Sequence, residues 1–68
     1  MQTNGNLIRR KRVESGRSLR AFAKAVSLGY DTISRIETGK SAPHPSTLKK
    51  IADGLGLRVA DLLLDAAE

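Results

Sequence analysis

The sequence predicts an all-α domain of five short helices packed around one core. Segments whose apolar residues keep helical spacing recur along the 68-residue chain, whereas no segment keeps the alternation of a strand. Cysteine is absent, so neither disulfides nor a thiolate metal site supports the fold. At this length the chain forms a single domain, residues 1–68, and its stability must come from packed apolar side chains.

The first predicted helix covers residues 6–15 and ends before Gly16, a residue type that commonly follows a helix end. Ile8 and Arg12 lie four residues apart and therefore share one face of this helix. Residues 1–5 are interpreted as a flexible arm, although their last residues either begin the helix or stay loose.

Two further helices follow in quick succession. One covers residues 19–26 after Ser18, which is a good N-cap, and the next covers residues 30–38 and is closed by a glycine. Only a brief segment separates them, in which Leu28 is expected to fill the space between the two helices. Residues 19–38 therefore form a helix-turn-helix arrangement.

A fourth helix is predicted over residues 45–55, since proline suits the first helical position and Gly56 suits the end. Gly54 is expected to cost this helix about 1 kcal/mol relative to alanine, as in an exposed helix interior. His44 is expected to cap the helix start. A fifth, short helix is predicted over residues 59–65.

Positive charge is concentrated in the first part of the chain. The net charge is +5, and residues 1–40 carry nine Lys/Arg against three Asp/Glu, whereas residues 41–68 carry three against four. A one-sided positive field favours a polyanionic partner. With one Phe, one Tyr, no Trp and no long apolar run, the sequence favours nucleic acid over a membrane and indicates a cytoplasmic protein.

Three runs carry a family resemblance: Ser-Leu-Arg-Ala-Phe-Ala at 18–23, Thr-Ile-Ser-Arg-Ile-Glu-Thr-Gly-Lys at 32–40 and Ile-Ala-Asp-Gly-Leu-Gly-Leu at 51–57. They resemble the Cro/repressor-type, lambda-repressor-like (xenobiotic-response-element) helix-turn-helix family of bacterial and phage regulators, and the resemblance extends from Ile8 to Leu63. It implies five helices, double-stranded DNA as the partner in a bacterial nucleoid or phage-infected cell, and a third helix that lies in the major groove.

The candidate base-reading residues lie on the third helix. At 100° per residue Ile33 and Ile36 point to one side, and the opposite face presents Asp31, Ser34, Arg35 and Thr38, with Tyr30 at its edge. Tyr30, Thr32 and Ser34 contact either bases or phosphates. Arg35 is the best candidate, because its planar fork can donate two hydrogen bonds to guanine O6 and N7. Asp31 either accepts from cytosine N4 or stabilises the positive end of its helix.

The resemblance also implies phosphate contacts at the start of the second helix and after the third. The matching positions hold Arg17, Ser18, Arg20, Thr38, Lys40 and Ser41. Lys40 also suits the negative end of the third helix, and both roles can hold together. Leu19 stands where the family commonly has glutamine, so Arg17 or Arg20 replaces that contact. Ser27 stands where the family commonly has glycine, in a tight turn.

The basic run at residues 9–12 resembles a nuclear-localisation or DNA-gripping cluster, but helical geometry separates its members. Arg12 falls on the buried stripe with Ile8, and a buried guanidinium needs an acceptor. Glu37 lies on the core side of the third helix, and the family pattern pairs these two positions. We therefore predict a structural ion pair between Arg12 and Glu37.

No enzymatic site is predicted. His44 is the only histidine and has no carboxylate cluster near it, so neither a metal site nor a general base is expected, and no cofactor is implied.

The predicted function is a transcription regulator, and specifically a repressor that binds a near-palindromic operator as a homodimer, with half-sites about one helical turn apart. Leu62, Leu63 and Leu64 are the predicted dimer contact, unless two of them close the monomer's own core. Two alternatives remain: an antitoxin that binds a toxin as well as DNA, and a helical interaction module that binds an effector domain. The module should lack a basic recognition face, which this chain has.

Overall fold

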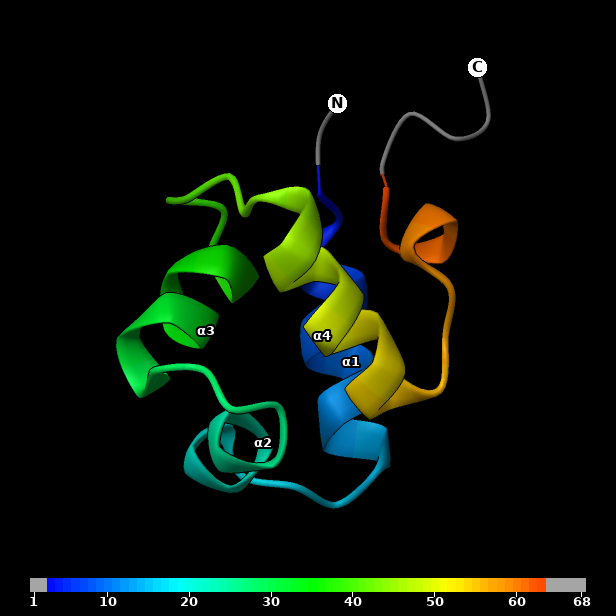
Figure 1. Ribbon diagram of the computed structural model, residues 1–68. Coiled ribbons are helices and arrows are strands. Elements are labelled where there is room, and N and C mark those ends of the chain that lie inside the picture. The colour runs from blue at the N-terminus through cyan, green and yellow to red at the C-terminus, as the bar shows by residue number, and fades with distance from the viewer. Residues whose placement is uncertain (1–2, 64–68) are drawn as a thin grey trace.

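The computed structural model describes residues 3–63, which form four α-helices and one 3-10 turn (Figure 1). The elements are α1 (Gly5–Glu14), α2 (Leu19–Ala25), α3 (Tyr30–Glu37), α4 (Pro45–Leu55) and η1 (Val59–Leu62). The predicted all-α class is confirmed. None of the described helices is long and apolar enough to cross a membrane.

Side chains next to the helices fix where two of them begin. The Asn4 side chain accepts a hydrogen bond from the Leu7 N–H at 3.0 Å, so α1 begins one residue earlier than predicted. Residues 3–5 therefore belong to the fold instead of a loose arm. Ser18 caps α2 as predicted. His44 occupies the N-cap position of α4 as predicted, and its side chain makes no capping hydrogen bond there.

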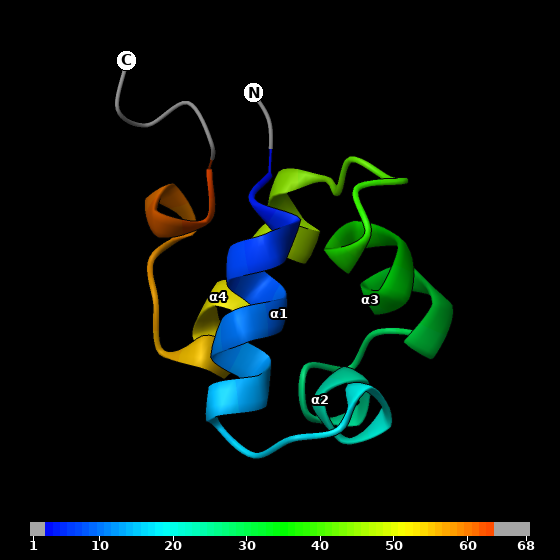
Figure 2. The ribbon, with the colours of Figure 1, turned by 180° about the vertical axis from the view of Figure 1, so that it is seen from behind.

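The predicted fifth helix is a single 3-10 turn that stops at Leu62. The carbonyl of Leu62 accepts a 2.6 Å hydrogen bond from the Asn4 N–H, which removes it from any continuing helix. Leu63 is extended and forms an isolated antiparallel bridge with Thr3. The two ends of the described chain thus lie side by side (Figure 2). The remainder of the predicted helix, residues 64–65, lies outside the described residues.

Every element contributes to the apolar core. Its fully or nearly fully buried members are Ile8, Phe22, Ala23, Val26, Ile33, Ile36, Leu48, Ile51, Ala52 and Leu62. Leu28 is half-buried and packs against this core between α2 and α3, as expected. The helical spacing therefore correctly placed Ile8 and Arg12 of α1 and Ile33 and Ile36 of α3 on the inward faces.

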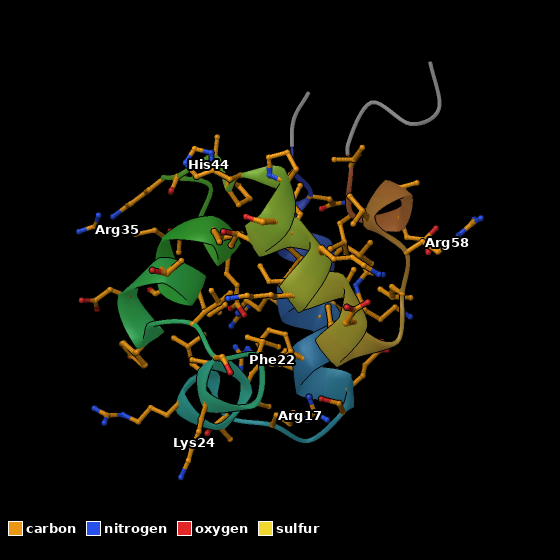
Figure 3. The ribbon with its side chains drawn as sticks, in the orientation of Figure 1. Arg17, Phe22, Lys24, Arg35, His44 and Arg58 are labelled. Carbon is orange, nitrogen blue, oxygen red and sulfur yellow. The ribbon has the colours of Figure 1, made fainter. Side chains whose placement is uncertain are left out.

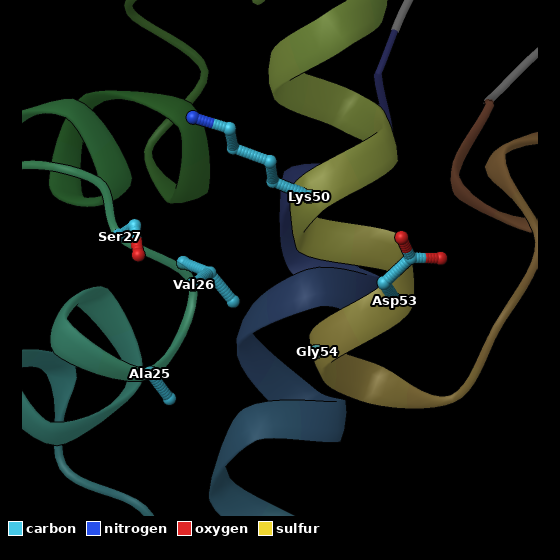
Figure 4. A pocket seen from close by; sticks show the side chains of 6 residues that line it. All are labelled: Ala25, Val26, Ser27, Lys50, Asp53 and Gly54. Carbon is cyan, nitrogen blue, oxygen red and sulfur yellow. The ribbon is translucent and has the colours of Figure 1, made fainter.

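Gly54 serves a purpose that the sequence did not reveal. A Cβ at this position would collide with Cγ1 of Val26 and would lie 3.3 Å from Cε1 of Phe22. Helix α4 therefore packs closely against the end of α2, and Gly54 does not lie in an exposed helix interior (Figure 4). The missing side chain is required by this close approach.

One buried ion pair joins α1 to α3. Nε of Arg12 donates to Glu37 at 2.8 Å and Nη2 donates to its other carboxylate oxygen at 3.2 Å, which is the pairing that the sequence predicted. Nη1 of Arg12 also donates to the carbonyl of Arg17 at 2.9 Å. Both side chains are nearly excluded from solvent. The pair therefore ties α1, the following loop and the inner face of α3 together.

Candidate nucleic-acid interface

The turn between α2 and α3 sets the direction of α3. Ser27 adopts a positive φ of 59°, in the left-handed region where a residue with a β-carbon is disfavoured. Gly29 is the N-cap of α3 and offers no side-chain hydrogen bond. Ile33 and Ile36 then bury one face of the helix. The opposite face is left toward solvent.

That outer face carries the predicted base readers. Tyr30, Asp31, Thr32 and Arg35 are exposed, and Ser34 is half-buried. Arg35 projects away from the body of the molecule (Figure 3). Among the described residues it forms no ion pair, although Asp31 lies one helical turn before it. The hydrogen-bond donors of Arg35 are therefore free for another partner.

Asp31 lies in the first turn of α3, where the N-cap supplies no side-chain acceptor. Its negative charge suits the positive end of the helix, and its exposed carboxylate can also accept from a base. This position is therefore compatible with both predicted roles.

The phosphate-contact residues predicted from the resemblance divide into two groups. Arg17 belongs to the fold: its Nη1 donates to the carbonyl of Gly54 at 3.1 Å, and its guanidinium lies 6.0 Å from the centre of the Phe22 ring (Figure 3). The last carbonyls of a helix lack partners within the helix, and Arg17 supplies one to α4. The structure thus gives Arg17 a structural partner where the sequence predicted a phosphate.

Thr38 is also committed within the fold, because its hydroxyl donates to the carbonyl of Ser34 at 2.9 Å. Ser18 accepts from the Ala21 N–H but keeps its own hydroxyl hydrogen for a partner. Lys40 and Ser41 are exposed, and the backbone N–H of Lys40 donates to the Arg35 carbonyl at 2.8 Å. Lys40 therefore stands directly at the end of α3.

Sequence reasoning missed one contact on this side of the molecule. The guanidinium carbon of Arg20, on α2, lies 5.2 Å from the centre of the Tyr30 ring, on α3. The two residues are separated by ten positions and belong to different helices, so no periodicity brings them together. The packing of α2 against α3 brings the two side chains together.

The predicted dimer contact is wrong for Leu62, whose side chain is fully buried in the core. Leu63 is half-buried and packs against the same core. The alternative expectation, in which two of the three leucines close the monomer, therefore holds for this pair. Leu64 lies outside the described residues.

No group of three or more metal-ligating side chains occurs within residues 3–63. A shallow depression lies between the α2–α3 turn and α4 (Figure 4). Its lining consists of Ala25, Val26, Ser27, Lys50, Asp53 and Gly54. It is lined partly by the residues that pack α4 on α2, and its charged side chains, Lys50 and Asp53, point in different directions instead of converging on a ligand (Figure 4).

Comparison with known proteins identifies the family of this chain. Residues 8–62 match the model of the family HTH_3, helix-turn-helix. The transcriptional regulator ClgR of Mycobacterium tuberculosis is 38% identical over 66 residues, which cover 94% of this chain. The chain spans 57% of the length of that curated relative.

Two solved structures share the fold. The clp gene regulator ClgR from C. glutamicum has a TM-score of 0.80 and 32% identity, over 93% of this chain and 81% of the other. An HTH_3 family transcriptional regulator from Vibrio cholerae has a TM-score of 0.77 and 33% identity, over 84% of this chain and 32% of the other. All three relatives are named as regulators and none as an enzyme, in agreement with the sequence prediction.

Proposed function

Because the chain belongs to the helix-turn-helix family HTH_3, we propose that it is a sequence-specific DNA-binding regulator of transcription that reads the major groove with α3. The observation that carries the proposal is the division of α3 into a buried apolar face and an exposed face of hydrogen-bonding side chains. The relatives named as transcriptional regulators support the same assignment.

Arg35 is the proposed reader of guanine. It is exposed, points outward and has no ion-pair partner among the described residues, so its planar fork is available for a bidentate contact with O6 and N7. Asp31, Thr32 and Ser34 are proposed as further contacts on the same face, with Asp31 either reading a base or stabilising the helix start. Lys40, Ser41, Ser18 and Arg20 are proposed to hold the flanking phosphates.

The finer proposal is a repressor that binds a near-palindromic operator as two copies. A module of this size buries only about 600–1,000 Å² on DNA, which favours paired binding for useful specificity. Leu62 is not part of a contact between copies, because it is buried. Sedimentation of the chain with operator DNA tests this: two copies on each operator are expected, and one copy on a full-length operator would contradict it.

The decisive experiment selects preferred sequences from random duplex DNA, first with the wild-type chain and then with Arg35→Lys and Arg35→Ala. Arg35→Lys keeps the charge but loses the fork, so guanine preference at one position of each half-site should weaken while the salt dependence of binding stays unchanged. Arg35→Ala should abolish the guanine preference at that position, which is worth about 1–3 kcal/mol of discrimination against the other bases.

Arg58→Ala is the matched control, since it removes one positive charge on the side of the molecule away from Arg35 (Figure 3). It should leave the selected sequence unchanged. All three variants should unfold within about 0.5 kcal/mol of wild type, because exposed side chains contribute little to stability. An unchanged motif with Arg35→Ala would show that another residue reads the DNA.

A further inference from the structure

The contact between Arg20 and Tyr30 joins the two helices of the helix-turn-helix unit on their solvent side. The guanidinium carbon lies 5.2 Å from the ring centre, within the range of a cation–π interaction. Both residues are exposed, and Tyr30 keeps 46% of its surface open to solvent. Because both residues are exposed, this contact contributes little to the core.

Stacking engages the face of a guanidinium and leaves its edge free. All five N–H groups of a stacked arginine can still donate hydrogen bonds in the plane of the group. Among the described residues Arg20 forms no ion pair, and no hydrogen bond of its side chain is present there. By contrast, Nη1 of Arg17, three residues earlier, donates to the Gly54 carbonyl. Arg20 is thus held in place while its donors remain available.

We propose that Tyr30 is a positioning residue that holds Arg20 in place for one DNA phosphate, instead of reading a base as the sequence predicted. The inference rests on the proposed function, because it assumes that α3 lies in the major groove. In that docking geometry the first helix of the unit crosses the DNA backbone. Arg20 stands in the first turn of α2, on the helix that meets phosphates, and therefore contacts a charge that is the same for every sequence.

A double-mutant cycle on the duplex selected by the wild type tests this role. Arg20→Ala should lower the slope of log affinity against log salt by about one, as the loss of one phosphate contact does. Tyr30→Ala should leave that slope unchanged, since the charge remains, but should lower affinity about two- to fivefold, the strength of an exposed cation–π contact. In the Arg20→Ala background, Tyr30→Ala should have no further effect.

Two control variants isolate the contribution of the aromatic ring. Tyr30→Phe keeps the aromatic face and should bind like the wild type, and Arg58→Ala should leave affinity and salt slope close to wild type. A loss of equal size in both Arg20 backgrounds would overturn the positioning role. A changed base preference with Tyr30→Ala would overturn it as well, because Tyr30 would then read DNA directly.

The free protein provides an independent measurement. A stacked ring shifts the NMR resonances of the Arg20 side-chain protons upfield, and this shift should vanish with Tyr30→Ala and persist with Tyr30→Phe. Its absence in the wild type would overturn the inference and leave the proposed function intact. A wild-type chain that selects no DNA sequence would instead overturn the proposed function itself.

Discussion

The charged side chains on the two faces of α3 differ in whether they are paired within the fold. On the inner face, both carboxylate oxygens of Glu37 accept hydrogen bonds from Arg12, and the pair is nearly excluded from water. On the outer face, Arg35 is exposed and forms no ion pair with any described residue. One arginine is satisfied inside the fold, and the other has donors available for a partner.

This difference separates stability from recognition. A buried charge that loses its partner is costly, whereas a charge in water loses little when a neighbour is removed. Substitutions on the inner side of α3 should therefore change the free energy of unfolding. Substitutions on the outer side should change DNA binding and leave folding intact.

The largest effect is expected from Glu37→Ala. It leaves the Arg12 guanidinium buried without its carboxylate and should lower the free energy of unfolding by about 3–5 kcal/mol, as measured by urea denaturation. The double variant Arg12→Met with Glu37→Leu removes both charges and should be considerably more stable than Glu37→Ala alone. A double variant as unstable as the single one would mean that packing, and not charge, makes this site important.

A smaller effect is expected from Gly54→Ala, which tests how closely α4 supports the helices in front of it. Helix propensity alone would make this variant more stable, by about 1 kcal/mol. The added Cβ collides with Val26, so we expect a net loss of about 1–3 kcal/mol in the free energy of unfolding.

Val26→Ala provides the partner for a double-mutant cycle with Gly54→Ala. Combined, the two changes should cost less than the sum of their separate effects, because the shorter side chain makes room for the Cβ. Strictly additive costs would show that the two positions do not touch.

The smallest effect, and one of opposite sign, is expected from Ser27→Gly in the turn that orients α3. Glycine tolerates the positive φ, so the free energy of unfolding should rise by about 1 kcal/mol or less after its larger loss of chain entropy. DNA affinity should stay unchanged, since the turn keeps its shape. Thermal unfolding and DNA titration measure the two quantities. A loss of stability would mean that the serine side chain contributes more than the strain costs.

Sequence reasoning located most of the fold because the relevant signals are local. The spacing of Ile33 and Ile36 identified the inner face of α3, and the serine before α2 identified its start. The local signals did not predict the structure near the C-terminus correctly. The helix predicted over residues 59–65 stops at Leu62, whose carbonyl bonds to Asn4 at the far end of the chain.

The candidate site shows the same limit. Arg17, Arg20 and Thr38 are all polar residues at positions where the resemblance implies phosphate contacts, and the sequence treats them alike. The structure separates them by their partners: a carbonyl of α4 for Arg17, an aromatic ring for Arg20 and a carbonyl of α3 for Thr38. The partners of Arg17 and Arg20 lie on other helices, so the spacing of residues within one helix does not reveal them, whereas Thr38 bonds the carbonyl four residues before it.

Local signals in the sequence are enough to predict the four α-helices, the buried faces of α1 and α3 and, with the family pattern, the Arg12–Glu37 pair. Helical periodicity and capping act over a few residues, so they can be seen in the chain without knowing the fold. The packing of the elements against one another determines that Gly54 leaves room for Val26, that Leu62 closes the core and that Arg20 stacks on Tyr30. Those outcomes depend on the distances between elements, which packing sets.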